Sequence, residues 1–438
     1  MPERLTRRRL LKTSAAAAAV AVARTTGAGE APAKSDAIHL AVIGTGLHGR
    51  QLINYIVKIP GVRFKAVCDI WSYSRRYSSR LLKARGQPVN VYEDYGEMLA
   101  GEKDLDAAII ATPDAFHADQ TVSCLKAGLH VFCEKEMHHT LDGARRMVRA
   151  ARETGKLLQI GRQHRSNPRY HAALDFLDHK KAVGRMLHVY GQWHGHKRVP
   201  FKWPAKYKIE DAVLKKHGFA SMQEFRDWRW SRKFSAGPIA NLGSHQIDVF
   251  NWFLHALPKA VTASGGRDYY DFYDWYDNIS CVFEWDCPRD GKTRTVRGDY
   301  HILTSTDDGG FYERFTGDEG SLTISENESL GGIRRERNVP MAEWEREIGG
   351  QATGRAYPPI RYPGDGDHVK PVHQYHLENF FGAVRGKAKL TCPAEVALAA
   401  TVSALKVNEA VATGRRLQFK PEEFNAWKPK VREKPDTK

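Results

Sequence analysis

The chain has 438 residues, 42% of them hydrophobic and 27% charged, so it is long enough for two or three domains and can bury a sizeable core. Its net charge of +16 is scattered, with only a small basic cluster in residues 428–438. A nucleic-acid surface would concentrate that charge in a stripe with interleaved aromatic residues, so no nucleic-acid partner is expected. The six cysteines show no CxxC or Cys/His spacing, and most of them lie in apolar runs and are predicted to be buried thiols, with no disulfide framework and no metal site.

The first 33 residues have the pattern of a targeting segment. Residues 6–12 include three consecutive arginines, and a mildly apolar stretch (15–23) and small residues follow. This pattern resembles a twin-arginine export signal, with cleavage expected near Ala33 or Ala23. The apolar stretch is too short to cross a bilayer, so no membrane span is predicted. The resemblance implies export of the folded protein by the twin-arginine machinery, to a periplasmic or extracellular location.

A glycine-rich turn follows the first predicted strand. Residues 38–57 indicate a strand, a turn and a helix, and the turn has the spacing GxGxxG with Gly44, Gly46 and Gly49. Such glycines make a tight turn, let the backbone approach a pyrophosphate and allow close helix packing, while the helix N-terminus attracts the anion. The next predicted strand ends in Asp69, whose carboxylate can accept from both ribose hydroxyls and would repel a 2′-phosphate. The sequence therefore predicts NAD rather than NADP.

Strands and helices alternate up to residue 161. Helices are predicted at 72–84, 95–99, 115–127 and 141–154, and strands at 62–68, 89–92, 107–111, 130–133 and 157–161. This alternation predicts a doubly wound parallel sheet in a Rossmann domain of residues 36–162. The carboxyl ends of parallel strands carry the functional groups, which favours a site at Thr112, Pro113, His117 and Lys135, the last within HVFCEKE. The alternatives are a solvated first helical turn for His117 and an ordinary charged turn for Lys135.

The second half of the chain indicates a different kind of domain, at residues 163–420. Strands are predicted at 186–193, 279–285, 293–303 and 321–325 without crossover helices, which favours a largely antiparallel sheet in an α+β domain. Residues 194–234 are interpreted as a substrate-facing insertion and residues 327–372 as loop. Helices are predicted at 372–384 and 393–413, the latter with an apolar stripe that can pack on the first domain, and residues 421–438 form a basic tail.

The motifs together support a resemblance to a known family. GxGxxG, Thr112-Pro113-Asp114 with His117, and residues 127–135 (AGLHVFCEK) resemble the glucose-fructose oxidoreductase, inositol dehydrogenase and MocA family over nearly the whole chain after residue 36. The resemblance implies that the lysine of a Glu-Lys-Pro motif lies by the nicotinamide and substrate, and that an Asp-x-x-x-His pair from the second domain completes the site. Carried over, the cofactor-binding residues are Gly44, Gly46, Leu47, His48, Gly49, Asp69, Thr112, Pro113, His117, Glu134 and Lys135.

Two residues depart from the family pattern. Glu136 replaces the proline, so we expect either a cis peptide bond, which is cheap only before proline, or a different backbone path. Asn241 stands where the family commonly has the aspartate, while His245 matches the histidine. An amide can orient a hydroxyl but cannot take up a proton, so His245, aided by Lys135, is the acid/base candidate. The alternative for His245 is a satisfied core histidine.

The remaining site predictions come from one helix and one aromatic turn. A helix over residues 237–254 would place Asn241, His245 and Asp248 on one face. Trp228-Arg229-Trp230 resembles an element that approaches the cofactor in some relatives, although a packed aromatic turn is the alternative. The predicted catalytic residues are Lys135, His245 and Asn241. The predicted substrate-binding residues are Gln163, Arg229, Asn241 and Asp248.

These features predict an exported NAD-dependent oxidoreductase that acts on a hydroxyl of a sugar or glycoside. Export creates a difficulty, because outside the cytoplasm no NAD pool is evident and a dehydrogenase that releases NADH would stop after one turnover. A glycosidase or lyase with tightly bound NAD, working through transient oxidation of a hydroxyl, is therefore the alternative. A non-catalytic sugar-binding protein on a dehydrogenase fold is a third. The open sheet face implied by the resemblance predicts a homo-oligomer.

Overall fold

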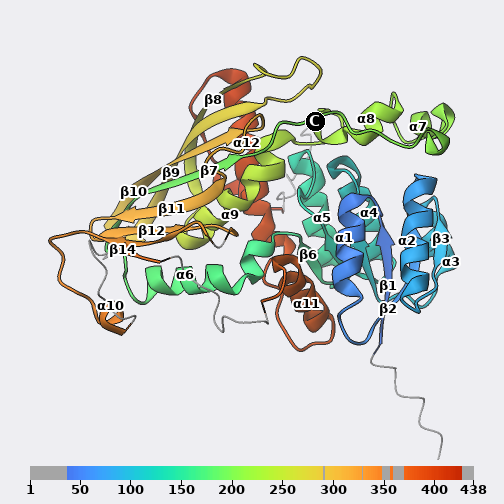
Figure 1. The fold of residues 1–438 in the computed structure, drawn as a ribbon, viewed down its shortest axis with the longest axis horizontal. Coiled ribbons are helices and arrows are strands. Elements are labelled where there is room, and N and C mark those ends of the chain that lie inside the picture. Colours follow the sequence, from blue (N-terminus) through green and yellow to red (C-terminus); the bar gives the residue numbers. More distant parts are fainter. Residues whose placement is uncertain (1–36, 290–291, 328, 348–355, 359–368, 427–438) are drawn as a thin grey trace, which may run out of the picture. The chain divides into compact units, whose positions relative to one another are not determined.

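In the computed structural model, the first half of the chain forms one parallel sheet with helices on both faces (Figure 1). The structure describes residues 37–289, 292–327, 329–347, 356–358 and 369–426. The predicted export signal and the tail beyond residue 426 lie outside these residues. The six strands have the order β3-β2-β1-β4-β5-β6, and each pair is parallel. They are β1 Ile38–Ile43, β2 Val62–Cys68, β3 Asn90–Tyr92, β4 Ala107–Ile110, β5 His130–Cys133 and β6 Leu158–Ile160.

The strands β1, β4, β5 and β6 are buried on both faces along most of their length, which is why their sequences are mainly apolar, whereas β2 and β3 carry exposed residues. One face, including Leu40, Val42 and Ile109, packs in a cluster with α1 (Leu47–Ile56) and α11 (Val372–Val384). The other face packs in a second cluster with α4 (Asp114–Lys126) and α5 (Leu141–Thr154). The remaining helices of this half are α2 Ser72–Ala84 and α3 Tyr95–Gly101. Thus α11, a helix from the C-terminal part of the chain, covers part of one face of the first sheet.

The second sheet has nine strands in the order β14-β13-β12-β11-β7-β10-β9-β8-β15. All its pairs are antiparallel except β7 with β10, which confirms the predicted fold class. Its strands are β7 Met186–His194, β8 Pro258–Gly266, β9 Asn278–Arg289, β10 Lys292–Leu303, β11 Phe311–Gly317, β12 Gly320–Ile324, β13 Gly332–Arg335, β14 Ala356–Tyr357 and β15 Leu417–Gln418.

Several elements of this half were not predicted. The interpretation of residues 327–372 as loop is wrong for β13, β14 and a short helix, α10 (Glu343–Glu347), which an ion pair of Arg335 with Glu345 joins to β13. The alternation does not end cleanly at Gln163, because a 3-10 turn, η1 (Gln163–Ser166), and a helix, α6 (Pro168–Asp178), follow β6. Further short elements are η2 Ala205–Tyr207, α7 Asp211–Lys216, α8 Met222–Arg226, η3 Trp228–Trp230 and η5 Pro421–Phe424.

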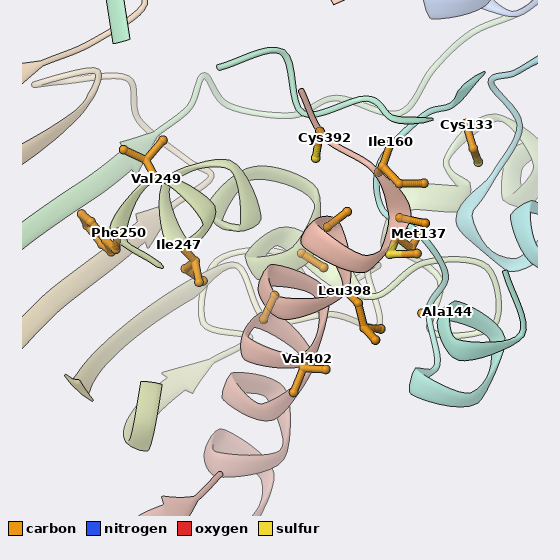
Figure 2. Packing of buried hydrophobic residues seen from close by; sticks show 14 of the residues in the cluster. Cys133, Met137, Ala144, Ile160, Ile247, Val249, Phe250, Cys392, Leu398 and Val402 are labelled. Atoms are coloured by element: carbon orange, nitrogen blue, oxygen red, sulfur yellow. The ribbon is translucent and has the colours of Figure 1, made fainter. Parts of the chain in front are cut away.

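The helix α12 (Ala394–Thr413) joins the two sheets into one core. It packs against α5 and β6 of the first half and against β8 and α9 (Ser244–Phe253) of the second, and Figure 1 shows it between the sheets. Figure 2 shows part of this shared cluster, including Met137, Ile160, Leu398 and Val402. By length and composition α12 could cross a membrane, but its inward face belongs to this core. Cys68, Cys124, Cys133, Cys281 and Cys392 are buried thiols, as predicted.

Candidate active site

The glycine turn between β1 and α1 has the geometry of a phosphate cradle. Gly44 has φ +86°, and a Cβ there would lie 2.6 Å from the carbonyl oxygen of Ala111. A Cβ on Gly49 would lie 2.0 Å from the oxygen of Gly44, so the helix can approach the turn only without a side chain. A Cβ on Gly46 would meet nothing within 4 Å, and α1 begins there without a side-chain cap. The free N–H groups of this helix start therefore fit a pyrophosphate.

Asp69 lies at the end of β2, next to this cradle. Its carboxylate accepts from the backbone N–H of Thr45 and from that of Trp71, both at 2.8 Å. These two donors fix the orientation of the carboxylate, while burial raises its pKa. The Thr45 contact ties the carboxylate directly to the glycine turn, which is the arrangement needed to hold a ribose beside the pyrophosphate.

A cavity of about 570 Å³ extends from the glycine turn across the ends of β2, β4 and β5. Its volume is typical of ligand sites, which span roughly 300–1,000 Å³. Its far wall comes from the second half of the chain, including Arg229, Trp230 and Leu242. The predicted site residues on its walls are Gly44, Gly46, Leu47, His48, Asp69, Thr112, Pro113, Lys135, Arg229 and Asn241.

Lys135 joins the two halves of the chain at this cavity. The peptide bond from Lys135 to Glu136 is cis, the first of the two expected backbone paths. The Lys135 ammonium donates to the main-chain oxygen of Asn241, which lies in a π-helical turn, η4 (Ile239–Gly243). The Asn241 amide donates to Ser235 Oγ at 2.6 Å and to the oxygen of Gly237 at 3.2 Å. Burial, followed by the charge of Arg229, lowers the pKa of Lys135.

Glu134 and His48 form a pair beside Lys135. The Nε2 of His48 lies 2.9 Å from Glu134 Oε1, and Glu134 Oε2 accepts from the backbone N–H of Lys135 at 3.2 Å. Burial alone would raise the pKa of Glu134, but the neighbouring His48, His373 and Lys135 lower it to about 2. Glu134 is therefore an anion that fixes the turn carrying Lys135, while His48 itself faces the cavity.

His245 is buried, at 5% exposure, and is not part of the cavity wall. Its ring lies 5.2 Å from that of His164 and 6.2 Å from that of Trp193, measured between centroids. Burial, then the charges of Lys135 and His164, hold its pKa well below the usual range, so the imidazole is neutral near pH 7. Its Nδ1 finds no hydrogen-bond partner among the described residues. A neutral imidazole whose nitrogen has no hydrogen-bond partner can accept a proton.

Besides Gly49, Glu134 and His245, three predicted site residues lie off the cavity wall, and each has protein partners. The two ring nitrogens of His117 contact the carbonyl oxygens of Glu136 (2.6 Å) and Thr112 (2.8 Å). The carboxylate of Asp248 binds Arg165 in a bidentate pair at 2.6 and 3.0 Å, and Gln163 donates to Glu326 at 3.1 Å. The π-helical turn shifts Asn241 out of the regular helix of His245 and Asp248. The ligand-binding roles of His117, Gln163 and Asp248 therefore stay predictions.

Glu136, the residue in place of the family proline, lies in a buried ion pair. Its carboxylate accepts from Arg162 at 2.9 and 3.0 Å and from Thr401 Oγ1 of α12 at 2.5 Å. Arg162 also donates to the oxygen of Ser244, at the start of α9. This pair connects the turn after β5 to both helices that approach it from the second half.

A buried polar group that the sequence did not indicate adjoins His245 through His164. His164 Nε2 lies 2.9 Å from Glu326 Oε1, and the His164 ring stacks on Tyr170 at 4.4 Å. Burial would lower the pKa of His164, but Glu326 outweighs it and raises that pKa. Tyr170 donates to Glu313 at 3.0 Å, and burial raises the pKa of Glu313 to about 7. The sequence signal that could have indicated this group was the position of Gln163 and His164 shortly after the end of β6, because functional groups lie at the carboxyl ends of parallel strands.

The six-stranded parallel sheet, the glycine cradle and Asp69 define a dinucleotide-binding protein with a second domain that completes its cavity. Residues 38–162 match the family described as the oxidoreductase family with an NAD-binding Rossmann fold, and residues 177–323 match the Gfo/Idh/MocA C-terminal domain. The two matches together cover more than half of the chain, and the protein belongs to the Gfo/Idh/MocA oxidoreductase family. NAD(H) is the cofactor of this family's first domain.

The protein is similar to several curated relatives and solved structures. Inositol 2-dehydrogenase from Rubrobacter xylanophilus is 33% identical over 36% of this chain and 44% of its own length. 2,7-Anhydro-N-acetylneuraminate hydratase from Mediterraneibacter gnavus is 24% identical over 52% of each chain. This chain thus spans about half the length of the curated relatives that it matches. The structure of levoglucosan dehydrogenase in complex with NADH has the same fold, with TM-score 0.66, 14% identity, and coverage of 87% of this chain and 98% of that chain.

Proposed function

We propose that the protein is an NAD-dependent oxidoreductase that acts on a hydroxyl of a sugar, a cyclic polyol or a glycoside. The observation that carries this proposal is the place of Lys135, on the wall of the same cavity as the glycine cradle and Asp69, and bonded to Asn241 of the second half. Inositol, levoglucosan and a sialic-acid anhydride in the names of the relatives support this substrate class. All three are rich in hydroxyl groups.

Each residue has a definite part in this chemistry. A bound NAD would supply the acceptor for the hydride of the hydroxyl-bearing carbon, and the hydroxyl proton would then have to pass to the protein. We assign His245 as the acceptor of that proton: it does not line the cavity, but it is neutral, has an unused Nδ1 and lies close enough to Lys135 for that charge to lower its pKa. The Lys135 ammonium lowers the energy of the developing alkoxide. Asn241 fixes Lys135 through its carbonyl oxygen.

The test is turnover of a panel of inositols, aldoses and nucleotide sugars with NAD, followed by the absorbance of NADH. Lys135→Ala is expected to lower kcat/KM by about 100-fold or more, the usual scale for a lost charge at the reacting oxygen. Lys126→Ala, at an exposed lysine of α4, is the control and should leave kcat/KM unchanged. If no member of the panel yields NADH, net oxidation is not the reaction.

A redox-neutral reaction is the second candidate, a glycosidase or lyase with tightly bound NAD. A hydratase among the relatives favours it, because adding or removing water changes no net oxidation state. The hydride taken from a sugar hydroxyl carbon would return to that carbon after elimination of the leaving group, so no oxidant is consumed. The resemblance of residues 6–12 to a twin-arginine signal also supports it, because an exported protein has no NAD pool to draw on.

This candidate is tested by incubating purified protein with chromogenic glycosides and no added NAD. Release of the chromophore without accumulation of NADH supports it, whereas NADH formed in step with product supports the first candidate.

Export is tested separately, by fractionation of cells that express the full chain and a variant with Arg7, Arg8 and Arg9 changed to lysine. The proposed homo-oligomer is tested by light scattering of the purified protein.

A further inference from the structure

The segment between β7 and η4, residues 195–238, packs on the first domain although it belongs to the second half of the chain. We name it the cover segment. Figure 1 shows its helices α7 and α8 beside the first sheet. Its residues Phe219, Phe225 and Arg226 line the cavity together with Asp69 and Trp71, which follow β2, and Phe225 and Arg226 pack against the Trp71 ring. The cover segment therefore lies against the part of the cavity where Asp69 would hold the adenosine ribose.

The contact between the cover segment and the first domain is a closed apolar core. Six side chains form it and each is at most 6% exposed: Trp71 from the first domain, and Ile209, Leu214, Phe219, Met222 and Phe234 from the cover segment. Phe219 stacks on Phe234 with ring centroids 4.2 Å apart, and Phe116 of α4 packs against both rings. To leave the first domain, the cover segment would have to expose this core to water.

Hydrogen bonds fix both ends of the same contact. The indole N–H of Trp71 donates to the oxygen of Tyr207 at 2.6 Å. The backbone N–H of Ala115 donates to the oxygen of Phe234 at 3.1 Å, and that of Ala236 donates to the buried carboxylate of Asp114 at 3.3 Å. The Arg226 guanidinium lies 4.7 Å from the centre of the Trp71 ring, so its position on the cavity wall is also determined.

We propose that the cover segment forms the outer wall of an adenosine subsite and keeps NAD bound from one turnover to the next. Trp71, Phe225 and Arg226 line this part of the cavity and pack against one another, so they form a fixed aromatic and cationic wall, the kind of surface against which a purine packs. The proposal rests on the redox-neutral candidate of the proposed function, because a net dehydrogenase must release NADH after each turnover. It goes beyond the Rossmann motif, since it assigns cofactor retention to residues of the other domain.

The experiment measures NAD directly. The full chain is purified without added NAD and desalted, and NAD released by acid is quantified by mass spectrometry. Protein that carries NAD is then mixed with an excess of isotopically labelled NAD, and the rate of exchange is followed. Leu214→Ala removes packing in the cover core without touching the cavity. Leu322→Ala removes an equally buried leucine from β12 of the second sheet and is the matched control. Met222→Ala is the second variant if Leu214→Ala fails to fold.

We expect near-stoichiometric NAD in the wild type and slow exchange. We expect exchange about tenfold or more faster in Leu214→Ala, because the opening equilibrium depends exponentially on the packing lost, and no acceleration in Leu322→Ala. Rapid exchange in the wild type, or equal rates in the two variants, would overturn the proposal and leave the NAD-dependent function intact. If the wild type neither carries NAD nor binds it in calorimetry, the proposed function fails as well.

Discussion

Lys135 and His245 lie in surroundings that move both of their pKa values downward, and the physical consequences differ. For Lys135, burial and the charge of Arg229 lower the pKa from its ordinary value near 10.5. The ammonium is charged below this pKa and is lost as pH rises through it. The rate of a reaction that needs this charge should therefore decline at a lower pH than it would with an ordinary lysine.

The first prediction concerns this alkaline limb. In a plot of kcat/KM against pH, Lys135→Arg should shift the alkaline decline to higher pH, since a guanidinium stays charged throughout the accessible range. The absolute rate should be lower, because the planar group does not match the ammonium in its contact with Asn241. An alkaline limb at the same pH in both proteins would assign that limb to another group.

The second prediction concerns the acid limb. Because the pKa of His245 lies well below 6.5, the ring is already neutral between about pH 6 and 8, and its capacity to accept a proton is lost only at more acid pH. The kcat/KM profile should therefore show no limb near 6.5 from this residue. His245→Gln should lower kcat/KM by about 100-fold or more while NAD binding, measured by calorimetry, stays unchanged. A limb near pH 6.5 that disappears in His245→Gln would contradict the neutral assignment.

At the scale of elements, the turn after β5 is held by helices far away in the sequence. Arg162 follows β6 and contacts Glu136, Ser244 and Thr401, so it ties the turn to α9 and α12. Arg162 and Glu136 are almost fully buried, at 1% and 0% side-chain exposure. Loss of one partner would leave a buried charge without compensation.

The third prediction is that Arg162→Met destabilises the protein by about 3–5 kcal/mol, the usual cost of breaking a buried pair. Urea unfolding followed by circular dichroism measures this free energy. The double variant Arg162→Met/Glu136→Gln is the control, and it should recover much of the loss because it removes the orphaned charge as well. A midpoint for Arg162→Met equal to that of the wild type would show that the pair contributes nothing.

The elements that local sequence determines were predictable, and those that depend on distant partners were not. The glycine turn, Asp69 and the strand–helix alternation follow from short-range spacing, and the structure has them where they were expected. The π-helical turn at Asn241 accepts a hydrogen bond from Lys135, which lies more than 100 residues away. His164 and Glu326 lie even farther apart in sequence, so the residues around either one could not predict their contact. β13 and β14 are very short and gave no clear alternation.

At the scale of the whole molecule, helices from the C-terminal part of the chain pack on both faces of the first sheet. One of its faces packs with Leu377, Phe380 and Phe381 of α11, and the other shares a cluster with Leu398 and Val402 of α12. Burial of each such side chain contributes roughly 1.5–3 kcal/mol. The backbone is shared too, because the N–H of Ile160 donates to the oxygen of Cys392.

The fourth prediction is that residues 37–162, expressed alone, do not form a cooperative NAD-binding domain. The fragment exposes the apolar surfaces that α11 and α12 cover, and this exposure costs about as much as the typical total stability of a domain. Thermal unfolding by circular dichroism and NAD calorimetry test it against the full chain. A sharp transition and NAD binding in the fragment would show that the two helices are dispensable.

The position of α12 also limits how the protein can move. Enzymes built from two domains often open and close a cleft by rotation about a hinge, which requires an interface that slides or separates at low cost. Here α12 packs against α5 and β6 of the first half and against α9 and β8 of the second. A rigid rotation of one sheet relative to the other would therefore break the contacts of α12 with one of the two halves. Entry of substrate must then depend on local motion of side chains and loops at the rim of the cavity, and the radius of gyration in solution should be the same with and without ligand.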